Sequence, residues 1–170
     1  METNYTIFDI ANWFLHQASM TQKKLQKLCY YAYAWYIVFA NDPEQVTEAT
    51  TSESLEKIEN CCFEAWSHGP VCRPLYDEYR LYRWHNIPIN QEEVVIDNEY
   101  LREALEQVWE VYGNWSGEEL ERLTHSEMPW RNARKDLPLG APCTARIDEL
   151  DMFNFYLTQL EDHSSNDTQN

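Results

Sequence analysis

Hydrophobic positions recur along much of this chain at spacings of three and four residues, which is typical of amphipathic helices. The first such segment begins at a capping box formed by Thr6 and Asp9 and predicts a short helix. A second helix is predicted from Thr21 to about Ala40. From Leu28 onward this segment is apolar on all sides, and such a helix is buried at the centre of a domain. We therefore expect residues 21–40 to form a central helix.

The rest of the chain predicts further helices, separated by polar or proline-containing segments. Helices are expected over Val71–Trp84, Asn98–Tyr112, Ser116–His125 and Ile147–Leu160. Short extended pieces are expected at Phe63–Trp66 and around Val94–Ile96, with a turn over Ser67–Pro70 between the first piece and the next helix. We interpret residues 44–60 as a polar loop or weak exposed helix inserted in the domain, and residues 126–144 as irregular.

These elements predict a mainly α protein, a compact single-domain helical bundle around the central helix with at most a short β-ribbon. The domain is expected to cover residues 1–160, followed by a disordered polar tail over 161–170. A length of 170 residues fits one domain, and a hydrophobic fraction of 44% is enough for a sizeable core.

Charge and cysteine content restrict the environment and the partners. The net charge of −16 repels nucleic acid at long range and favours basic partners, so nucleic acid is not an expected ligand. The most apolar stretch, Leu28–Ala40, is too short to span a membrane, and the N-terminus does not resemble a secretory signal. Five cysteines, an odd number, favour reduced thiols and a cytoplasmic location.

Two groups of residues raise the question of catalysis or metal binding. Cys61, Cys62, His68 and Cys72 are close in sequence, but their spacing matches no standard zinc pattern, so core or loop thiols are favoured. His125 and Glu127 are conceivable as an acid–base pair, with Ser126 or a distant cysteine as nucleophile. Nothing nearby resembles the strained turn that presents a catalytic serine, which favours a structural polar cluster instead. We predict no catalytic residue, no metal and no cofactor.

Basic and aromatic residues provide the remaining candidates. Lys27 directly precedes the apolar run, where it is expected to extend its amine to the surface or to pair with a buried carboxylate. Tyr31 belongs to an aromatic run whose hydroxyl groups must reach a polar network, a partner or the surface. Arg131 lies near Trp130 in a basic group that suits an acidic partner or intramolecular salt bridges, of which the second is favoured.

Three blocks in order along the chain resemble the Panacea domain of SocA-like and phage GepA-like antitoxins. They are KLQKLCYYA with WY shortly after it, FEAWSHGPV, and ELERLTHSEMPWRNAR, which begin at Lys24, Phe63 and Glu119. The resemblance implies a mostly helical, phage-associated protein that neutralises a cognate toxin by direct contact. One branch of the family implies an adaptor that delivers its toxin to a protease.

Because the family has no established catalytic residues, its motif positions are carried over as structural or partner-facing. Structural roles are expected for Trp66, Gly69, Pro70 and Trp130. Partner binding, or a shared polar network, is expected for Lys27, Tyr31, His125, Glu127 and Arg131. Two alternatives remain open: an enzyme using His125 with a cysteine or glutamate, and an interaction protein of a phage or mobile element with a host target other than a toxin.

Overall fold

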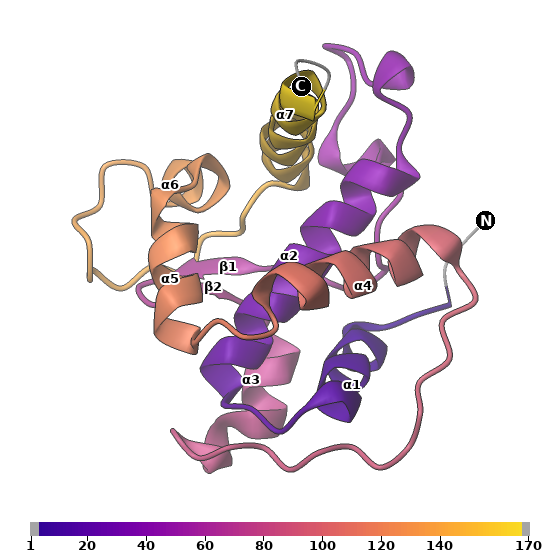
Figure 1. Ribbon diagram of the computed structural model, residues 1–170. Helices are drawn as coiled ribbons and strands as arrows, with labels where there is room; N and C mark the ends of the chain where they lie inside the picture. Colours follow the sequence, from indigo (N-terminus) through magenta and orange to yellow (C-terminus); the bar gives the residue numbers. More distant parts are fainter. Residues whose placement is uncertain (1–3, 168–170) are drawn as a thin grey trace.

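Helix α2, Gln22–Ala40, runs through the middle of the molecule and is surrounded by most of the other elements (Figure 1). Thr21 caps its N-terminus by accepting a hydrogen bond from the backbone of Lys24. Nearly every side chain from Leu25 to Val38 is buried. The predicted central helix is therefore confirmed, and the reason is the one expected: a helix without a polar face needs partners on every side.

The structure is a computed structural model that describes residues 4–167, and it is mainly helical. The helices are α1 (Ile7–Gln17), α2, α3 (Arg73–Tyr79), α4 (Glu99–Tyr112), α5 (Gly117–Ser126), α6 (Met128–Arg134) and α7 (Glu149–Asp167). Strands β1 (Glu64–Trp66) and β2 (Gly69–Val71) form one short hairpin, and single 3-10 turns cover Pro43–Gln45, Ser52–Ser54 and Arg80–Tyr82. The predicted fold class, a helical bundle with a short β-ribbon, is thus confirmed.

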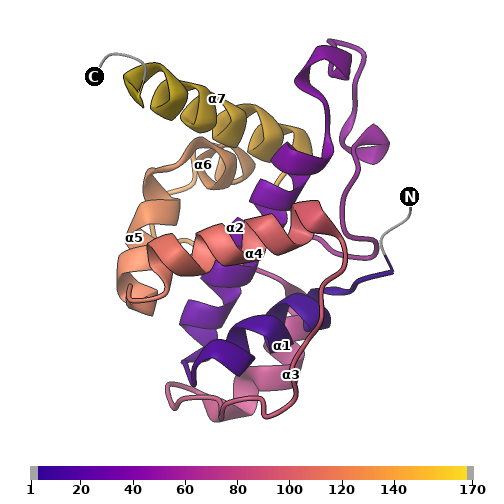
Figure 2. The ribbon, with the colours of Figure 1, turned by 45° about the vertical axis from the view of Figure 1, so that its right-hand side comes forward.

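Amphipathic helices cover the central helix on several sides (Figure 2). Helix α4 begins at the Asn98 cap and crosses α2 through its buried stripe of Leu101, Leu105 and Val108. Helix α1 begins at the expected capping box of Thr6 and contacts both α2 and α4. Helices α5 and α7 also pack on α2. None of the helices in residues 4–167 is both long and apolar enough to cross a membrane.

The hairpin lies against α2 and is tighter than the sequence suggested. Ala65 pairs with Pro70 in the antiparallel ladder, so Gly69 and Pro70 belong to β2 rather than to the turn. The segment before α7 lies along the other side of β1, where Ala65 donates a backbone hydrogen bond of 2.8 Å to Ala145. The hairpin is consequently held between the central helix and residues far away in sequence.

The predicted helix Val71–Trp84 is wrong at both ends. Val71 is in β2, because the side chain of Gln26 both accepts from and donates to the backbone of Cys72 and holds it extended before α3 starts. After Tyr79 the helix tightens into a 3-10 turn that ends at Arg83, with a φ of 55°. The hydrophobic pattern continues through this region, but contacts from α2 decide where the helix lies.

Three other expectations need correction. Residues 126–144 are not irregular throughout, because α6 forms there with Pro129 in its first turn, where a missing N–H costs little. Residues 94–96 form no strand, and Ile96 instead anchors the loop in the core. Helix α7 continues to Asp167, so the polar residues 161–167 are helical rather than disordered. Residues 168–170 lie outside the described part.

Candidate functional site

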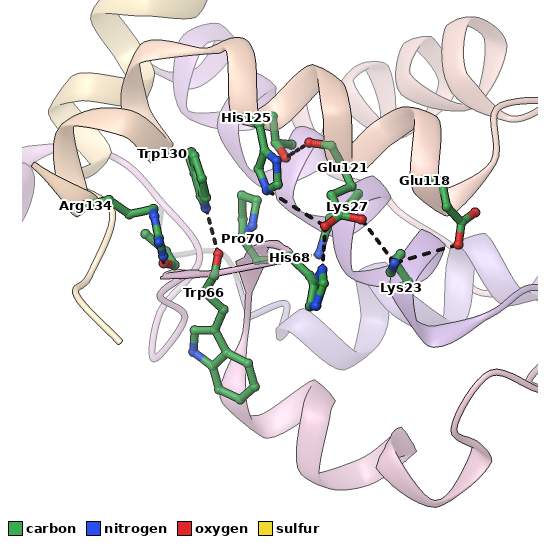
Figure 3. Close-up of polar contacts among 12 residues, drawn as sticks. Lys23, Lys27, Trp66, His68, Pro70, Glu118, Glu121, His125, Trp130 and Arg134 are labelled. Atoms are coloured by element: carbon green, nitrogen blue, oxygen red, sulfur yellow. Dashed lines mark hydrogen bonds and ion pairs between the residues drawn. The ribbon is translucent and has the colours of Figure 1, made fainter. Parts of the chain in front are cut away.

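Residues from all three motif blocks meet beside the hairpin, although they are far apart in sequence (Figure 3). Lys27 comes from α2, Gly69 and Pro70 come from β2, and His125 and Trp130 come from α5 and α6. The elements that carry them contact one another, since β2 packs on both α2 and α5. The motif positions therefore form one structural unit.

Lys27 is buried beneath the hairpin. Its side chain is only 2% exposed, and its Nζ donates a hydrogen bond of 3.2 Å to the carbonyl of Pro70. Burial lowers the pKa of Lys27 to about 7, although the nearby Glu121 carboxylate opposes part of this effect. The amine neither reaches the surface nor forms an ion pair within 4.0 Å in the described chain.

Gly69 covers Lys27 so closely that a side chain here would be strained and would have to displace Lys27. Its φ of +101° is a conformation that side chains disfavour, and a Cβ at this position would lie 2.7 Å from Cε of Lys27. The same Cβ would lie 3.0 Å from Oγ1 of Thr124. The Gly-Pro pair of the second block is thus explained by contact with the lysine of the first block.

Glu121 is the centre of the polar cluster. Its carboxylate accepts from Nζ of Lys23 at 3.0 Å and contacts Nδ1 of His68 at 2.6 Å. Nε2 of His125 lies 4.0 Å away, one helical turn along α5. Burial would raise the pKa of Glu121, but hydrogen bonds from His68 and Lys23 outweigh it, and the pKa is lowered. Glu121 was missed at the level of sequence; its i,i+4 spacing to His125 was the available signal.

The imidazole of His125 is partly buried and packs against a neighbouring ring instead of facing solvent. It stacks on Trp130 with 4.1 Å between ring centroids, and its Nε2 is buried with no hydrogen-bond partner in the described chain. Burial lowers the pKa of His125, with Glu121 acting in the opposite direction. Trp130 in turn donates from Nε1 to the carbonyl of Trp66 at 2.9 Å, which ties α6 to the hairpin.

Tyr31 and Glu127 belong to a second polar group. Oε1 of Glu127 accepts from the hydroxyl of Tyr31 at 2.6 Å and from that of Tyr156 at 3.0 Å, and the hydroxyl of Tyr30 lies 3.2 Å from that of Tyr156. Burial raises the pKa of Glu127 to about 7, and the two tyrosine hydrogen bonds only partly oppose it. In residues 4–167 no hydrogen bond joins this group to Lys27 or His125, so the network expected among these residues divides into two.

The basic group of the third block has two different environments. Arg134 is buried and donates to three backbone carbonyls, those of Ala65, Pro138 and Ala141. Arg131 is exposed and has no ion pair within 4.0 Å among residues 4–167. Within that range, neither arginine forms the intramolecular salt bridge that the sequence favoured. Both line a hollow of about 310 Å³ beside α6.

The cysteines lie in and around the core. Cys29, Cys61 and Cys72 are buried, and Cys62 and Cys143 are partly buried. A hydrogen bond between the side chains of Cys61 and Cys72 lowers the pKa of Cys72, whereas burial raises that of Cys61. Within residues 4–167 no three His, Cys, Asp or Glu side chains are grouped so that they could hold a metal ion.

Fold and site together define a small helical domain whose shared motif residues hold a hairpin against a central helix. The family model described as "Antitoxin SocA-like, Panacea domain" matches residues 25–131. The chain belongs to this family, which confirms the resemblance seen in its three motif blocks. Comparisons with curated proteins and with solved structures gave no match.

Proposed function

We propose that this protein is an antitoxin that neutralises a cognate toxin protein by binding it directly in the cytoplasm, without catalysing a reaction. The observation that carries the proposal is the match to the antitoxin family over residues 25–131, the region in which the three motif blocks form one unit. The motif residues at the hairpin serve mainly to hold the fold, so the surfaces around them are left to contact a partner.

The charge and the exposed apolar side chains suit a protein partner. A net charge of −16 speeds the encounter with a basic protein. Several large apolar residues are exposed, among them Leu81 and Trp84 after α3 and Leu137 and Leu139 after α6. Exposed aromatic and aliphatic side chains of this kind dominate the binding energy of many interfaces.

A function without catalysis is supported by the surroundings of the candidate acid–base residues. Nε2 of His125 is buried, and Oγ of Ser126 donates to the carbonyl of Leu123 at 2.7 Å rather than to a base. The Glu127 carboxyl group is occupied by two tyrosine hydroxyls. The geometry of a nucleophile beside a general base is therefore absent around these residues in the described chain.

Growth rescue tests the proposal. The product of a gene adjacent to that of this chain is expressed alone and together with this protein. We expect the neighbour to stop growth, and this protein to restore it and to co-elute with the neighbour in a fixed ratio. A harmless neighbour, or rescue without co-elution, would overturn neutralisation by direct binding. Rescue accompanied by loss of the toxin that depends on a protease would instead indicate delivery to that protease.

A further inference from the structure

The hollow beside α6 is lined by cationic, imidazole and apolar side chains. They are His125, Trp130, Arg131, Arg134, Lys135, Leu137 and Leu139. Among the described residues no carboxylate lines it, although the chain has 29 acidic residues and only 13 basic ones. In a protein of this charge, three cations gathered without an acid at one hollow produce a local positive potential that attracts anions.

Arg134 provides the buried part of this charge. Its side chain is only 3% exposed, and its guanidinium lies 4.7 Å from the centre of the Trp130 ring. It donates to the carbonyls of Ala65 at 3.0 Å, Pro138 at 3.1 Å and Ala141 at 2.7 Å. These acceptors are neutral, and a guanidinium has five N–H groups, so two donors and the full charge remain without a counter-ion in the described chain.

Arg131 on α6 and Lys135, directly after the end of this helix, add two exposed cations. Neither has a carboxylate within 4.0 Å in the part of the chain that the structure describes. Elsewhere on the surface, Arg73 forms an ion pair with Glu64 at 2.7 Å, and Arg146 forms one with Glu149 at 2.6 Å. The hollow differs from those places because its lining gathers three cations, one of them buried, and no acid. The exposed Asp136 lies outside it, in an adjoining hollow that Arg131 and Lys135 also line.

We infer that this hollow binds a carboxylate carried by an apolar segment of the partner protein. The inference rests on the proposed function, because it names the chemistry by which the partner is recognised. A planar carboxylate matches the guanidinium fork of the exposed Arg131, while Arg134, whose Nη2 already donates to two carbonyls, adds its charge from the buried side. Leu137 and Leu139, which are 46% and 74% exposed, form an apolar rim that suits a neighbouring apolar side chain. A strongly hydrated phosphate gains little from such a rim.

The two charge signals are compatible within one interface. The acidic remainder of the surface attracts basic parts of the partner, while the basic hollow accepts an acidic part of it. Opposite signs on the same face fix the orientation in which a partner docks and disfavour other arrangements.

A titration of the isolated protein tests the inference without requiring a toxin. N-acetyl-leucine serves as the probe, since it combines a carboxylate with an apolar side chain, and N-acetyl-leucinamide and inorganic phosphate are the comparisons. Binding is followed by NMR through the indole N–H of Trp130 and the side-chain N–H of Arg134. We expect saturable shifts of both signals with N-acetyl-leucine, weaker shifts with phosphate and none with the neutral amide.

The double variant Arg131→Gln, Lys135→Gln is expected to bind the probe about tenfold more weakly, as the loss of charge-assisted hydrogen bonds implies. Arg122→Gln on α5, which removes an exposed arginine that does not line the hollow, is the matched control and is expected to bind normally. Equal binding of the amide, tighter binding of phosphate, or an unaffected double variant would each overturn the inference.

The outcome can be separated from that of the proposed function. Probe binding without growth rescue would leave the carboxylate site standing and remove the antitoxin proposal. If the double variant no longer binds the probe but still restores growth, the antitoxin proposal stands. The hollow is then not the place where the partner is recognised.

Discussion

Gly69 connects backbone conformation with the burial of a charged side chain. Its φ of +101° disfavours a side chain, and a Cβ there would lie only 2.7 Å from Cε of Lys27. The lysine below it has lost most of its hydration and keeps one hydrogen bond, to Pro70. The absence of a side chain at this position thus lets the hairpin lie directly over Lys27.

Gly69→Ala is expected to destabilise the fold by about 3 kcal/mol, because strain at positive φ and overpacking against Lys27 act together. Gly140→Ala is the control, since Gly140 also has a positive φ, +91°, but no atom lies within 4 Å of its Cβ position. The control is expected to lose only about 1 kcal/mol. Urea denaturation measures both, and equal losses would contradict the role given to the contact with Lys27.

Glu127 makes stability depend on pH. Its pKa is raised from 4.5 to about 7, so folding takes up a proton between these values and stability falls as pH rises through this window. The shift corresponds to about 3 kcal/mol at pH values above the window. Glu127→Gln keeps an acceptor for Tyr31 and Tyr156 but does not ionise.

Glu127→Gln is therefore expected to be more stable than the wild type at pH 8, and to lose this advantage at pH 4.5. Urea denaturation at the two pH values measures the difference. Tyr31→Phe is a useful comparison: it removes a hydrogen bond that lowers the Glu127 pKa and should extend the loss of stability to higher pH. A difference between Glu127→Gln and wild type that does not vary with pH would contradict this account.

Helix α6 shows how one side chain can organise several elements. The Arg134 guanidinium joins α6 to β1 through Ala65 and to the following loop through Pro138 and Ala141. The loop carries two exposed leucines and forms one wall of the basic hollow. Its shape consequently depends on the arginine fork as well as on packing.

Arg134→Lys keeps the charge but loses the fork, and it is expected to cost about 2–3 kcal/mol, since a lysine ammonium cannot reach the three carbonyls in the same geometry. Arg122→Lys, at an exposed position of α5, is the control and should change stability by less than about 0.5 kcal/mol. Thermal unfolding compares the two variants. If Arg134→Lys lowers stability no more than Arg122→Lys does, the hydrogen bonds from Arg134 to the three carbonyls contribute little.

Elements with local signals could be predicted from sequence, and elements set by distant contacts could not. The central helix was predicted almost to its ends, because Thr21 caps it and Asn41-Asp42-Pro43 follows it. The predicted start of α3 was wrong, because the side chain of Gln26, which is far away in sequence, holds Cys72 extended. Helix α6 was missed because prolines were interpreted as breakers, although Pro129 lies where a helix tolerates it.

The candidate site follows the same rule. Lys27 and His125 were chosen from motif blocks, and the structure brings both close to one hairpin. Glu121, which joins Lys23, His68 and the neighbourhood of His125, was missed because its role depends on contacts across three elements. The division of the polar residues into two groups likewise depends on the direction of each side chain, which spacing does not fix.

The whole molecule combines a strongly acidic composition with the basic hollow beside α6. At a net charge of −16, association with a basic toxin is expected to slow as ionic strength rises, because salt screens the attraction that speeds encounter. Stopped-flow mixing at increasing salt concentrations measures the association rate. A rate that is independent of salt would show that the net charge has no part in partner capture.

The most direct test of the central claim is a calorimetric titration of the purified, folded protein with the purified product of the toxin gene. The account predicts saturable binding with a fixed stoichiometry, and weaker binding by the Arg131→Gln, Lys135→Gln variant than by Arg122→Gln. No binding between two folded proteins whose coexpression restores growth would contradict neutralisation by direct contact.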